Sequence, residues 1–84
     1  MSSFNFMILT PTGPLFEGEV ESLVVEATDG KLGVLAHHAP MVASLGSGDI
    51  CIKQSGEEKT FAADAGLLEV GSDGSVMILA TAVS

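Results

Sequence analysis

Ten glycines are distributed along this 84-residue chain, and they constrain its fold more than any other feature. Most of the intervals between them are shorter than an average α-helix, and glycine itself weakens a helix interior. Within the intervals, apolar and polar residues alternate at the period of a β-strand, as Ile50 and Ile52 do with Cys51 and Lys53. The pattern predicts short strands separated by turns. The glycines stand at positions 13, 18, 30, 33, 46, 48, 56, 66, 71 and 74.

Strands spaced at roughly 8 to 12 residues and bounded by turn residues are typical of an antiparallel sandwich or barrel. No internal repeat, linker or low-complexity tract divides the sequence, so we predict one all-β domain over residues 1–84. A chain of this length buries only roughly 60 to 65% of its unfolded surface, and its core is therefore small. Cys51 has no second cysteine to pair with, and no zinc pattern is present. A partner-bound or oligomeric state is expected to supply the missing stability.

The segment from Glu26 to Ile50 contains two turns that bracket one short strand. Asp29-Gly30 is a hairpin signal, because a two-residue turn of the primed type requires positive φ, which glycine adopts without steric cost. Leu32 to Ala36 is predicted to be extended up to His37-His38-Ala39-Pro40, where the proline fixes its own φ and restricts the residue before it. The two turns are therefore expected at opposite ends of the strand, as exposed polar loops.

Several predicted strands are apolar on both faces, whereas an antiparallel sandwich normally exposes one polar face of each sheet. Contiguous exposed apolar surface usually marks an interaction site, so we expect a docking face. The alternative is a scatter of exposed apolar residues of the kind that small proteins commonly carry. The strands in question are Met7-Ile8-Leu9, Leu23-Val24-Val25, Met41-Val42-Ala43 and Val76 to Ala80.

Eleven acidic residues, three lysines and no arginine give the chain a net charge of −8. This charge repels nucleic acids and anionic lipid headgroups, so direct binding to DNA, RNA or a membrane surface is not expected. Phosphate groups are usually held by basic residues, metals or glycine-rich helix starts, and none of these assembles here. No apolar run approaches the ~20 residues that a membrane span requires. The sequence thus predicts a soluble protein of the cytoplasm without a nucleotide site.

The histidines, serines and glycines do not form a recognisable catalytic or metal-binding group. Adjacent residues of an extended chain point to opposite sides, so His37 and His38 are not expected to bind one ion. The serines, histidines and aspartates carry no local signature of a catalytic triad. Gly46-Ser47-Gly48 lacks both the third glycine and the helix of a dinucleotide-binding motif.

Cys51 and a group of three glutamates are expected to have structural roles. Cys51 has no basic neighbour other than Lys53 and is interpreted as an inert thiol. Glu17, Glu19 and Glu21 share one face of a predicted strand, where they are expected to form a solvated or edge-protecting face. We therefore predict no catalytic residue, no cofactor-binding residue and no metal ligand.

Seven short motifs follow one another along nearly the whole chain, and their order and spacing together are specific although each is weak alone. They are Thr10-Pro11-x-Gly13, Phe16-Glu17-Gly18, Asp29-Gly30-Lys31-Leu32-Gly33-Val34-Leu35, His38-Ala39-Pro40, Leu45-x-x-Gly48, Gly66-Leu67-Leu68-Glu69-Val70 and Ile78-Leu79-Ala80. Through these motifs the chain resembles the N-terminal β-sandwich domain of the epsilon subunit of bacterial F-type rotary ATP synthases.

The resemblance implies a flattened antiparallel β-sandwich of about ten short strands on the central stalk of a rotary proton-translocating ATP synthase. The implied role is non-catalytic and needs no cofactor: the domain docks on the gamma subunit and the c-ring and so couples proton flow to ATP synthesis. It would be a peripheral component on the cytoplasmic side of the plasma membrane. The isolated chain would be a monomer or a weakly self-associating dimer. Composition alone leaves open a stand-alone β-sandwich adaptor or small-ligand-binding domain.

The resemblance also assigns contacts to individual positions. Its implied c-ring contacts are Asp29, Gly30 and Lys31. The implied gamma contacts at matching positions are Thr10, His38 and Ala43. Met41 and Val42 join the gamma group because they belong to the same apolar strand, and we assign Met41 to the outer face of that strand.

Three features depart from the family pattern. Lys31 stands where a second acidic residue is usual, which alters the charge presented to the ring. Ala36-His37 replaces Pro-Gly before His38, which alters the geometry of that corner. The family normally continues into a two-helix C-terminal domain, associated with inhibition of hydrolysis and in some members with ATP binding, whereas this sequence stops at Ser84. We therefore expect the C-terminal helical hairpin to be absent and the isolated chain neither to hydrolyse nor to bind ATP tightly.

Overall fold

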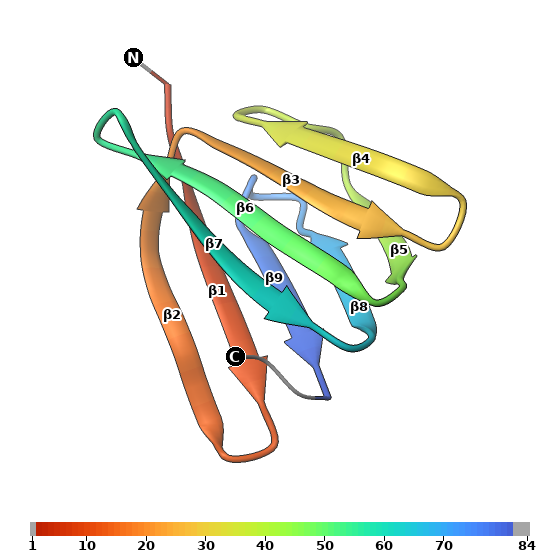
Figure 1. Cartoon of the computed structure of the whole chain (residues 1–84). Helices are drawn as coiled ribbons and strands as arrows, with labels where there is room; N and C mark the ends of the chain where they lie inside the picture. Colours follow the sequence, from red (N-terminus) through yellow and green to blue (C-terminus); the bar gives the residue numbers. More distant parts are fainter. Residues whose placement is uncertain (1, 82–84) are drawn as a thin grey trace.

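A computed structural model describes residues 2–81 of the chain, which form β-strands joined by short turns (Figure 1). The predicted all-β fold is confirmed, with nine strands in this range where about ten were expected. None of these residues lies in a helix, and hence none lies in a helix that could cross a membrane. The strands are β1 (Phe4–Thr10), β2 (Gly13–Val20), β3 (Ser22–Ala27), β4 (Gly30–Leu35), β5 (Met41–Leu45), β6 (Gly48–Gln54), β7 (Glu57–Ala63), β8 (Gly66–Val70) and β9 (Val76–Ala80).

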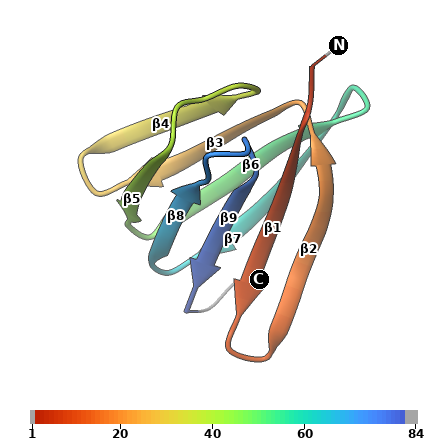
Figure 2. The ribbon, with the colours of Figure 1, turned by 180° about the vertical axis from the view of Figure 1, so that it is seen from behind.

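The strands form one hydrogen-bonded sheet that folds over into two layers (Figures 1 and 2). One layer, called here the β1 layer, has the order β2-β1-β9-β8-β5, and the other, the β6 layer, contains β4-β3-β6-β7. The layers are joined where Ala27 of β3 pairs with Leu45 of β5. Folding one sheet in this way brings two apolar faces together, which is the arrangement of a β-sandwich.

One pairing differs from the antiparallel arrangement that the sequence predicts. β1 and β9 run parallel, with Phe6 opposite Val76 and Ile8 opposite Ile78, whereas the other strand pairs are antiparallel. Parallel neighbours need a long connection between them. Here strands β2 to β8 supply that connection, because the first and last strands of the described chain meet in the middle of one layer.

The core lies between the two layers and is entirely apolar among the described residues. Every strand except β7 contributes to it through alternate residues, since successive side chains of a strand point to opposite faces. Ile8, Leu23, Leu68 and Ile78 have no exposed surface at all. The full set is Phe4, Phe6, Ile8, Val20, Leu23, Val25, Val34, Leu45, Ile50, Ile52, Leu68, Val70, Val76, Ile78 and Ala80.

Side chains, and not a backbone ladder, close the gap between β2 and β7 at the two ends of the sheet. The Phe16 ring lies with its centroid 5.9 Å from that of Phe6 and 5.9 Å from that of Phe61. Aromatic pairs at this separation contribute beyond their buried area. Gln54 adds a cross-link by donating from Nε2 to the Glu19 carbonyl oxygen at 2.9 Å. The sandwich is therefore closed on both sides, by backbone at β3–β5 and by side chains here.

Both turns predicted around β4 are present at its opposite ends, as expected. The β3–β4 turn consists of Thr28 and Asp29, one residue earlier than predicted, because Gly30 already pairs with Ala27. Gly30 still carries the predicted positive φ, at 130°. In the other turn His37 adopts a φ of 65°, an uncommon conformation for a residue with a side chain. The substitution of Ala36-His37 for Pro-Gly thus leaves a left-handed residue at the corner.

Candidate docking surface

The outer face of the β1 layer carries a continuous band of apolar side chains, which we call the apolar strip. Its residues alternate along their strands with the core residues, so each one points away from the core. Leu67 and Leu79 are 39% and 43% exposed. No strand of the described chain covers this face, which Figure 2 shows from its outer side. The strip consists of Met7, Leu9, Leu67, Met77 and Leu79.

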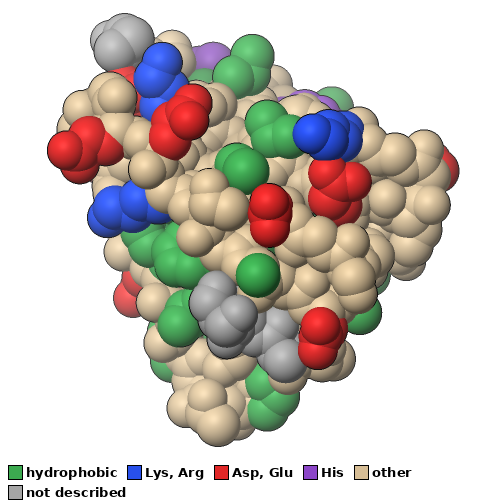
Figure 3. Space-filling view, viewed as in Figure 1, with side chains coloured by type: hydrophobic (Ala, Val, Ile, Leu, Met, Phe, Trp, Pro, Cys, Tyr) green, Lys and Arg blue, Asp and Glu red, His purple; other side chains and the backbone are tan. Residues whose placement is uncertain are grey.

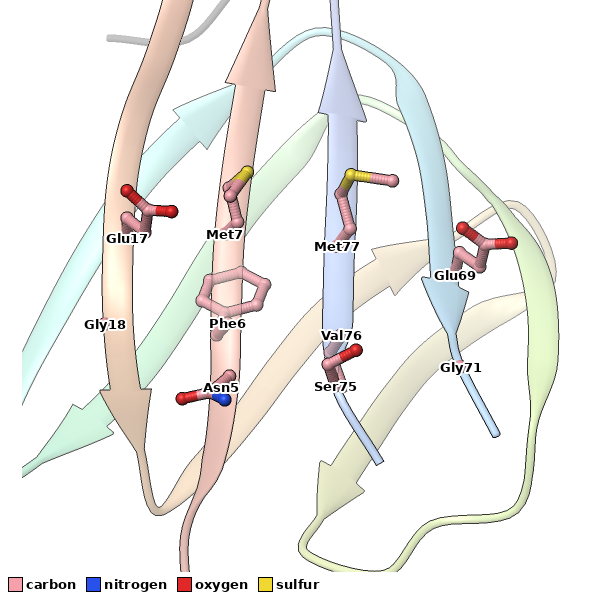
Figure 4. A pocket seen from close by; sticks show the side chains of 10 residues that line it. All are labelled: Asn5, Phe6, Met7, Glu17, Gly18, Glu69, Gly71, Ser75, Val76 and Met77. Carbon is pink, nitrogen blue, oxygen red and sulfur yellow. The ribbon is translucent and has the colours of Figure 1, made fainter. Parts of the chain in front are cut away.

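The strand register arranges the strip in two parallel rows. In the first row Glu17, Met7, Met77 and Glu69 follow one another across β2, β1, β9 and β8. Figure 4 shows the two methionines side by side, with one glutamate on each flank. In the second row Leu9, Leu79 and Leu67 lie next to one another. The strip is therefore two to three strands wide and bordered by acid in one of its rows.

A hollow of about 500 Å³ lies over the first row. Met7 and Met77 form its floor together with the inner residues Phe6 and Val76. Glu17 and Glu69 are exposed at its edges. Methionine side chains are flexible and polarizable, and they adapt to irregular partners. A floor of this kind is suited to contact with another macromolecule.

A second hollow, of about 480 Å³, lies where the β3–β4 turn approaches β5. It is lined from the turn side by Asp29 and Lys31 and from the strand side by Met41 to Ser44. Lys31 Nζ lies 3.8 Å from Glu26 Oε2, and the lysine side chain is 75% exposed. An exposed ion pair of this kind contributes roughly 0 to 1 kcal/mol. The turn is therefore a solvated polar surface, in contrast to the strip.

Residues 3–84 match the family model described as the ATP synthase Delta/Epsilon chain, beta-sandwich domain. The chain belongs to this family. The match covers all nine strands of the structure, and it confirms the resemblance that the sequence motifs indicate.

Curated relatives are similar over almost the whole chain. The ATP synthase epsilon chain of Bacillus pumilus is 42% identical over 82 residues, and that of Ruminococcus albus is 35% identical over 83 residues. These alignments cover 98% and 99% of this chain but 62% of each relative. The chain thus spans about three-fifths of the length of the curated relatives that it matches.

Two solved structures have the same fold. A chain in the mitochondrial ATP synthase of Euglena gracilis, in a structure of OSCP, F1 and c-ring, superposes with a TM-score of 0.93 at 19% identity. The superposition covers 100% of this chain and 54% of the Euglena chain. A chain in the central stalk and c-ring structure of Tetrahymena thermophila gives a TM-score of 0.85 at 14% identity, with 99% and 66% coverage. At these identities the likeness establishes the sandwich fold.

The structure corrects one assignment within β5. The sequence interpretation places Met41 on the outer face of the strand, but Met41 packs against the core. Val42 points outward instead and is 61% exposed. The register explains this, because Met41 pairs with the buried Val70 and Val42 with the exposed Glu69. Ala43, half-buried, lies opposite the buried Leu68.

The remaining positions assigned to gamma do not lie together. Thr10 is at the end of β1, where its hydroxyl donates to the Gly13 carbonyl oxygen at 2.9 Å. His38 follows β4, and its Nδ1 lies 2.8 Å from the Ala39 carbonyl oxygen, so that nitrogen carries the proton and donates. Thr10 borders the outer leucines, in a hollow with Leu9 and Leu79. Its assignment to gamma stays a prediction, as do those of the c-ring turn.

Sequence reasoning missed Glu17, Glu69, Met77 and Leu79 as members of a common surface. Their separate signals were present, since Val76 to Ala80 is apolar on both faces and Glu69 is the one charged residue of its strand. Only the register brings them together. No group of three or more potential metal ligands occurs in the described range, although His37 and His38 were the first candidates considered.

Proposed function

We propose that this chain is a non-catalytic component of the central stalk of a rotary proton-translocating ATP synthase. It docks on the gamma subunit and on the c-ring and so helps to couple proton flow to ATP synthesis. Residues 1–84 act in this role as a single β-sandwich domain, peripheral to the membrane on its cytoplasmic side. The proposal is supported by membership of the Delta/Epsilon sandwich family and by the structural neighbours, which come from ATP synthase structures that include the c-ring and the central stalk.

The observation that carries the proposal is the apolar strip. A small acidic domain has no reason to keep Leu67 and Leu79 exposed beside Met7 and Met77 unless a partner covers them, since large contiguous apolar patches mark interaction sites. A coupling part also requires a stiff body. The single folded sheet and its apolar core supply that stiffness.

Two different surfaces serve the two partners in this proposal. The strip and the exposed Val42 face gamma, because burying apolar area gives a stable contact that persists through rotation. The turn around Asp29, Gly30 and Lys31 faces the c-ring, because exposed polar groups give weaker contacts that tolerate sliding. His38 and Thr10 border the gamma surface.

Binding tests the proposal directly. The full chain, mixed with the gamma subunit of the same organism, should co-elute with it in gel filtration, and this pair should bind detergent-solubilised c-ring. Met77→Asp should abolish gamma binding, because a buried unpaired charge costs several kcal/mol. Thr60→Asp, at an exposed position of β7 in the β6 layer, is the matched control and should bind normally.

Two outcomes would contradict the proposal. The first is a wild-type chain that binds neither gamma nor ring. The second is equal loss of binding in both variants while each keeps the wild-type melting temperature.

A further inference from the structure

Carboxylates border the first row of the apolar strip on two strands, and we call these two edges the carboxylate columns, the second of which has a single residue. Glu17 and Glu19 lie on β2 at one side, and Glu69 lies on β8 at the other. Between them only β1 and β9 intervene, so the columns are three strand spacings apart, or about 14 Å. An α-helix with its side chains is about 10 to 12 Å across. The space between the columns therefore has the width of one helix lying along the strands.

None of the lysines of this chain neutralises the border. Its three lysines are Lys31, Lys53 and Lys59, on β4, β6 and β7, all in the β6 layer. The one ion pair among the described residues joins Lys31 to Glu26. Glu17 and Glu69 therefore present unpaired negative charge on either side of an apolar floor.

We propose that the partner element which occupies the apolar strip is an amphipathic α-helix of gamma, with an apolar stripe flanked on both sides by Lys or Arg. This inference rests on the proposed function and adds the chemistry of the contact. The apolar stripe packs on Met7, Met77 and the outer leucines. The basic side chains lay their aliphatic stems along the floor and place their charges against Glu17 on one side and Glu69 on the other. The helix axis follows β1 and β9.

Other occupants fit the same surface less well. A second copy of this chain would set carboxylates against a face that itself carries no lysine or arginine, and like charges oppose association. A flat sheet would meet the exposed carboxylate columns before it reached the methionine floor of the 500 Å³ hollow. A convex helix would fit between Glu17 and Glu69, which flank the two methionines in Figure 4, and would reach that floor.

Charge reversal on the two columns tests the inference. Calorimetry would compare gamma affinity for the wild-type chain and for Glu17→Lys/Glu69→Lys at 50 mM and 500 mM NaCl. We expect the variant to bind about ten- to thirtyfold more weakly at low salt, because two exposed pairs are lost and replaced by repulsion. At high salt the loss should shrink to about threefold, since screening shortens the range of exposed charges.

A matched control separates this effect from net charge. Asp49→Lys/Glu58→Lys makes the same change of charge on the outer face of the β6 layer and should alter gamma affinity by less than about twofold at either salt. Glu17→Gln/Glu69→Gln keeps the size of the side chains and should give an intermediate loss. This second variant keeps the test decisive if the lysine variant folds poorly.

Cross-linking identifies the partner element. A photoreactive amino acid in place of Leu79 should attach to gamma residues spaced three and four apart, within a segment that has Lys or Arg on both flanks. Cross-links at every second residue, or to a segment without basic residues, would overturn the inference. The same holds if the charge-reversed variant matches its control. In those cases gamma still binds and the proposed function stands, whereas absence of any gamma binding overturns both.

Discussion

The two outer faces of the sandwich are built from the same alternating strand pattern but differ in what they expose. On the β6 layer, the outer residues mix charges of both signs with small and apolar side chains, as Figure 3 shows. Lys53 lies directly across from Glu58, and Lys31 lies beside Glu26. On the β1 layer the centre is apolar, and the charged residues at its border, Glu17, Glu19 and Glu69, are all acidic.

The difference indicates that the outer face of the β6 layer is suited to contact with solvent and that of the β1 layer to contact with a partner. Opposite charges placed across a strand pair stabilise a solvated face and need no other molecule. An apolar centre with unpaired acids at its border leaves both its apolar surface and its charge uncompensated by the described residues. Such a face is complete only with a partner that is apolar in the middle and basic at its edges. Substitutions on the two faces test how strictly this division holds.

The largest expected effect separates the inner from the outer side of β9. Ile78 is fully buried and Leu79, its neighbour, is 43% exposed. Ile78→Ala should lower the free energy of unfolding by about 2 to 5 kcal/mol, because it removes buried methyl groups and leaves a cavity. Leu79→Ala should cost less than about 1 kcal/mol of stability but weaken gamma binding severalfold. Urea unfolding and calorimetry of both variants measure the two quantities. Similar losses of stability in the two variants would contradict the assignment of faces.

The second effect tests the backbone beneath the strip. Gly66 begins β8 opposite Ala80, and a methyl group there would overlap the Leu79 carbonyl oxygen. Backbone cannot move aside as a side-chain tip can, so Gly66→Ala should destabilise the fold by about 1 to 3 kcal/mol. Gly46→Ala is the control, because nothing lies within 4 Å of the added methyl group. If the two variants unfold at the same urea concentration, the close approach of β8 and β9 is not as described.

The sequence predicts the elements of this fold because their signals are local. The turn between β6 and β7 follows from Ser55-Gly56, where both residues adopt positive φ, and that between β8 and β9 from Ser72 to Ser75. The sequence also predicts which side chains of β8 face the core. The charge on Glu69 requires that residue to face solvent, so Leu67 faces outward with it and Leu68 faces the core. Local chemistry thus determines where strands begin and end.

Where a strand is apolar throughout, the sequence does not predict which of its faces is buried or which strand it pairs with. Met41 and Val42 are both apolar, so period-two alternation cannot say which one is buried, and the prediction for Met41 was wrong. The parallel pairing of β1 with β9 joins residues some seventy positions apart, and no local signal encodes it. The candidate strip depends on that pairing. Its members were therefore recognisable as apolar strands but not as one surface.

A smaller effect is expected at the turn assigned to the c-ring. Lys31→Glu replaces the partner of Glu26 with a like charge, and the exposed pair contributes roughly 0 to 1 kcal/mol. Gamma affinity should stay within about twofold of wild type, because the turn lies outside the strip. Proton pumping by the assembled synthase should fall at low salt and recover as salt screens the turn. A salt-independent loss of gamma binding would contradict the division into two surfaces.

The smallest expected effect concerns the β8–β9 turn, just beyond the strip. Asp73 Oδ1 accepts from the Ser75 hydroxyl at 2.7 Å and from the Ser75 backbone N–H at 3.0 Å. These hydrogen bonds, the hydroxyl first, lower the pKa of the Asp73 carboxyl below its ordinary value. The charged form is thus favoured in the folded state, so its contribution to stability is present above the unfolded-state pKa of about 3.9 and is lost as pH falls through the lower folded-state pKa.

A double-mutant cycle on the melting temperature isolates this contribution. Asp73→Asn, Ser75→Ala and the double variant should show coupling at pH 7 that declines below the unfolded-state pKa of about 3.9 and is lost as pH falls through the lower folded-state pKa. Because the turn is fully solvated, the coupling should be small, and screening by salt should reduce it further. Gamma affinity should not change with Asp73→Asn, since the acids proposed to bind the basic helix are Glu17 and Glu69. If Asp73→Asn weakened gamma binding as much as the Glu17 and Glu69 variant, the acidic border would include this turn, and the distinction between strip and turn would be wrong.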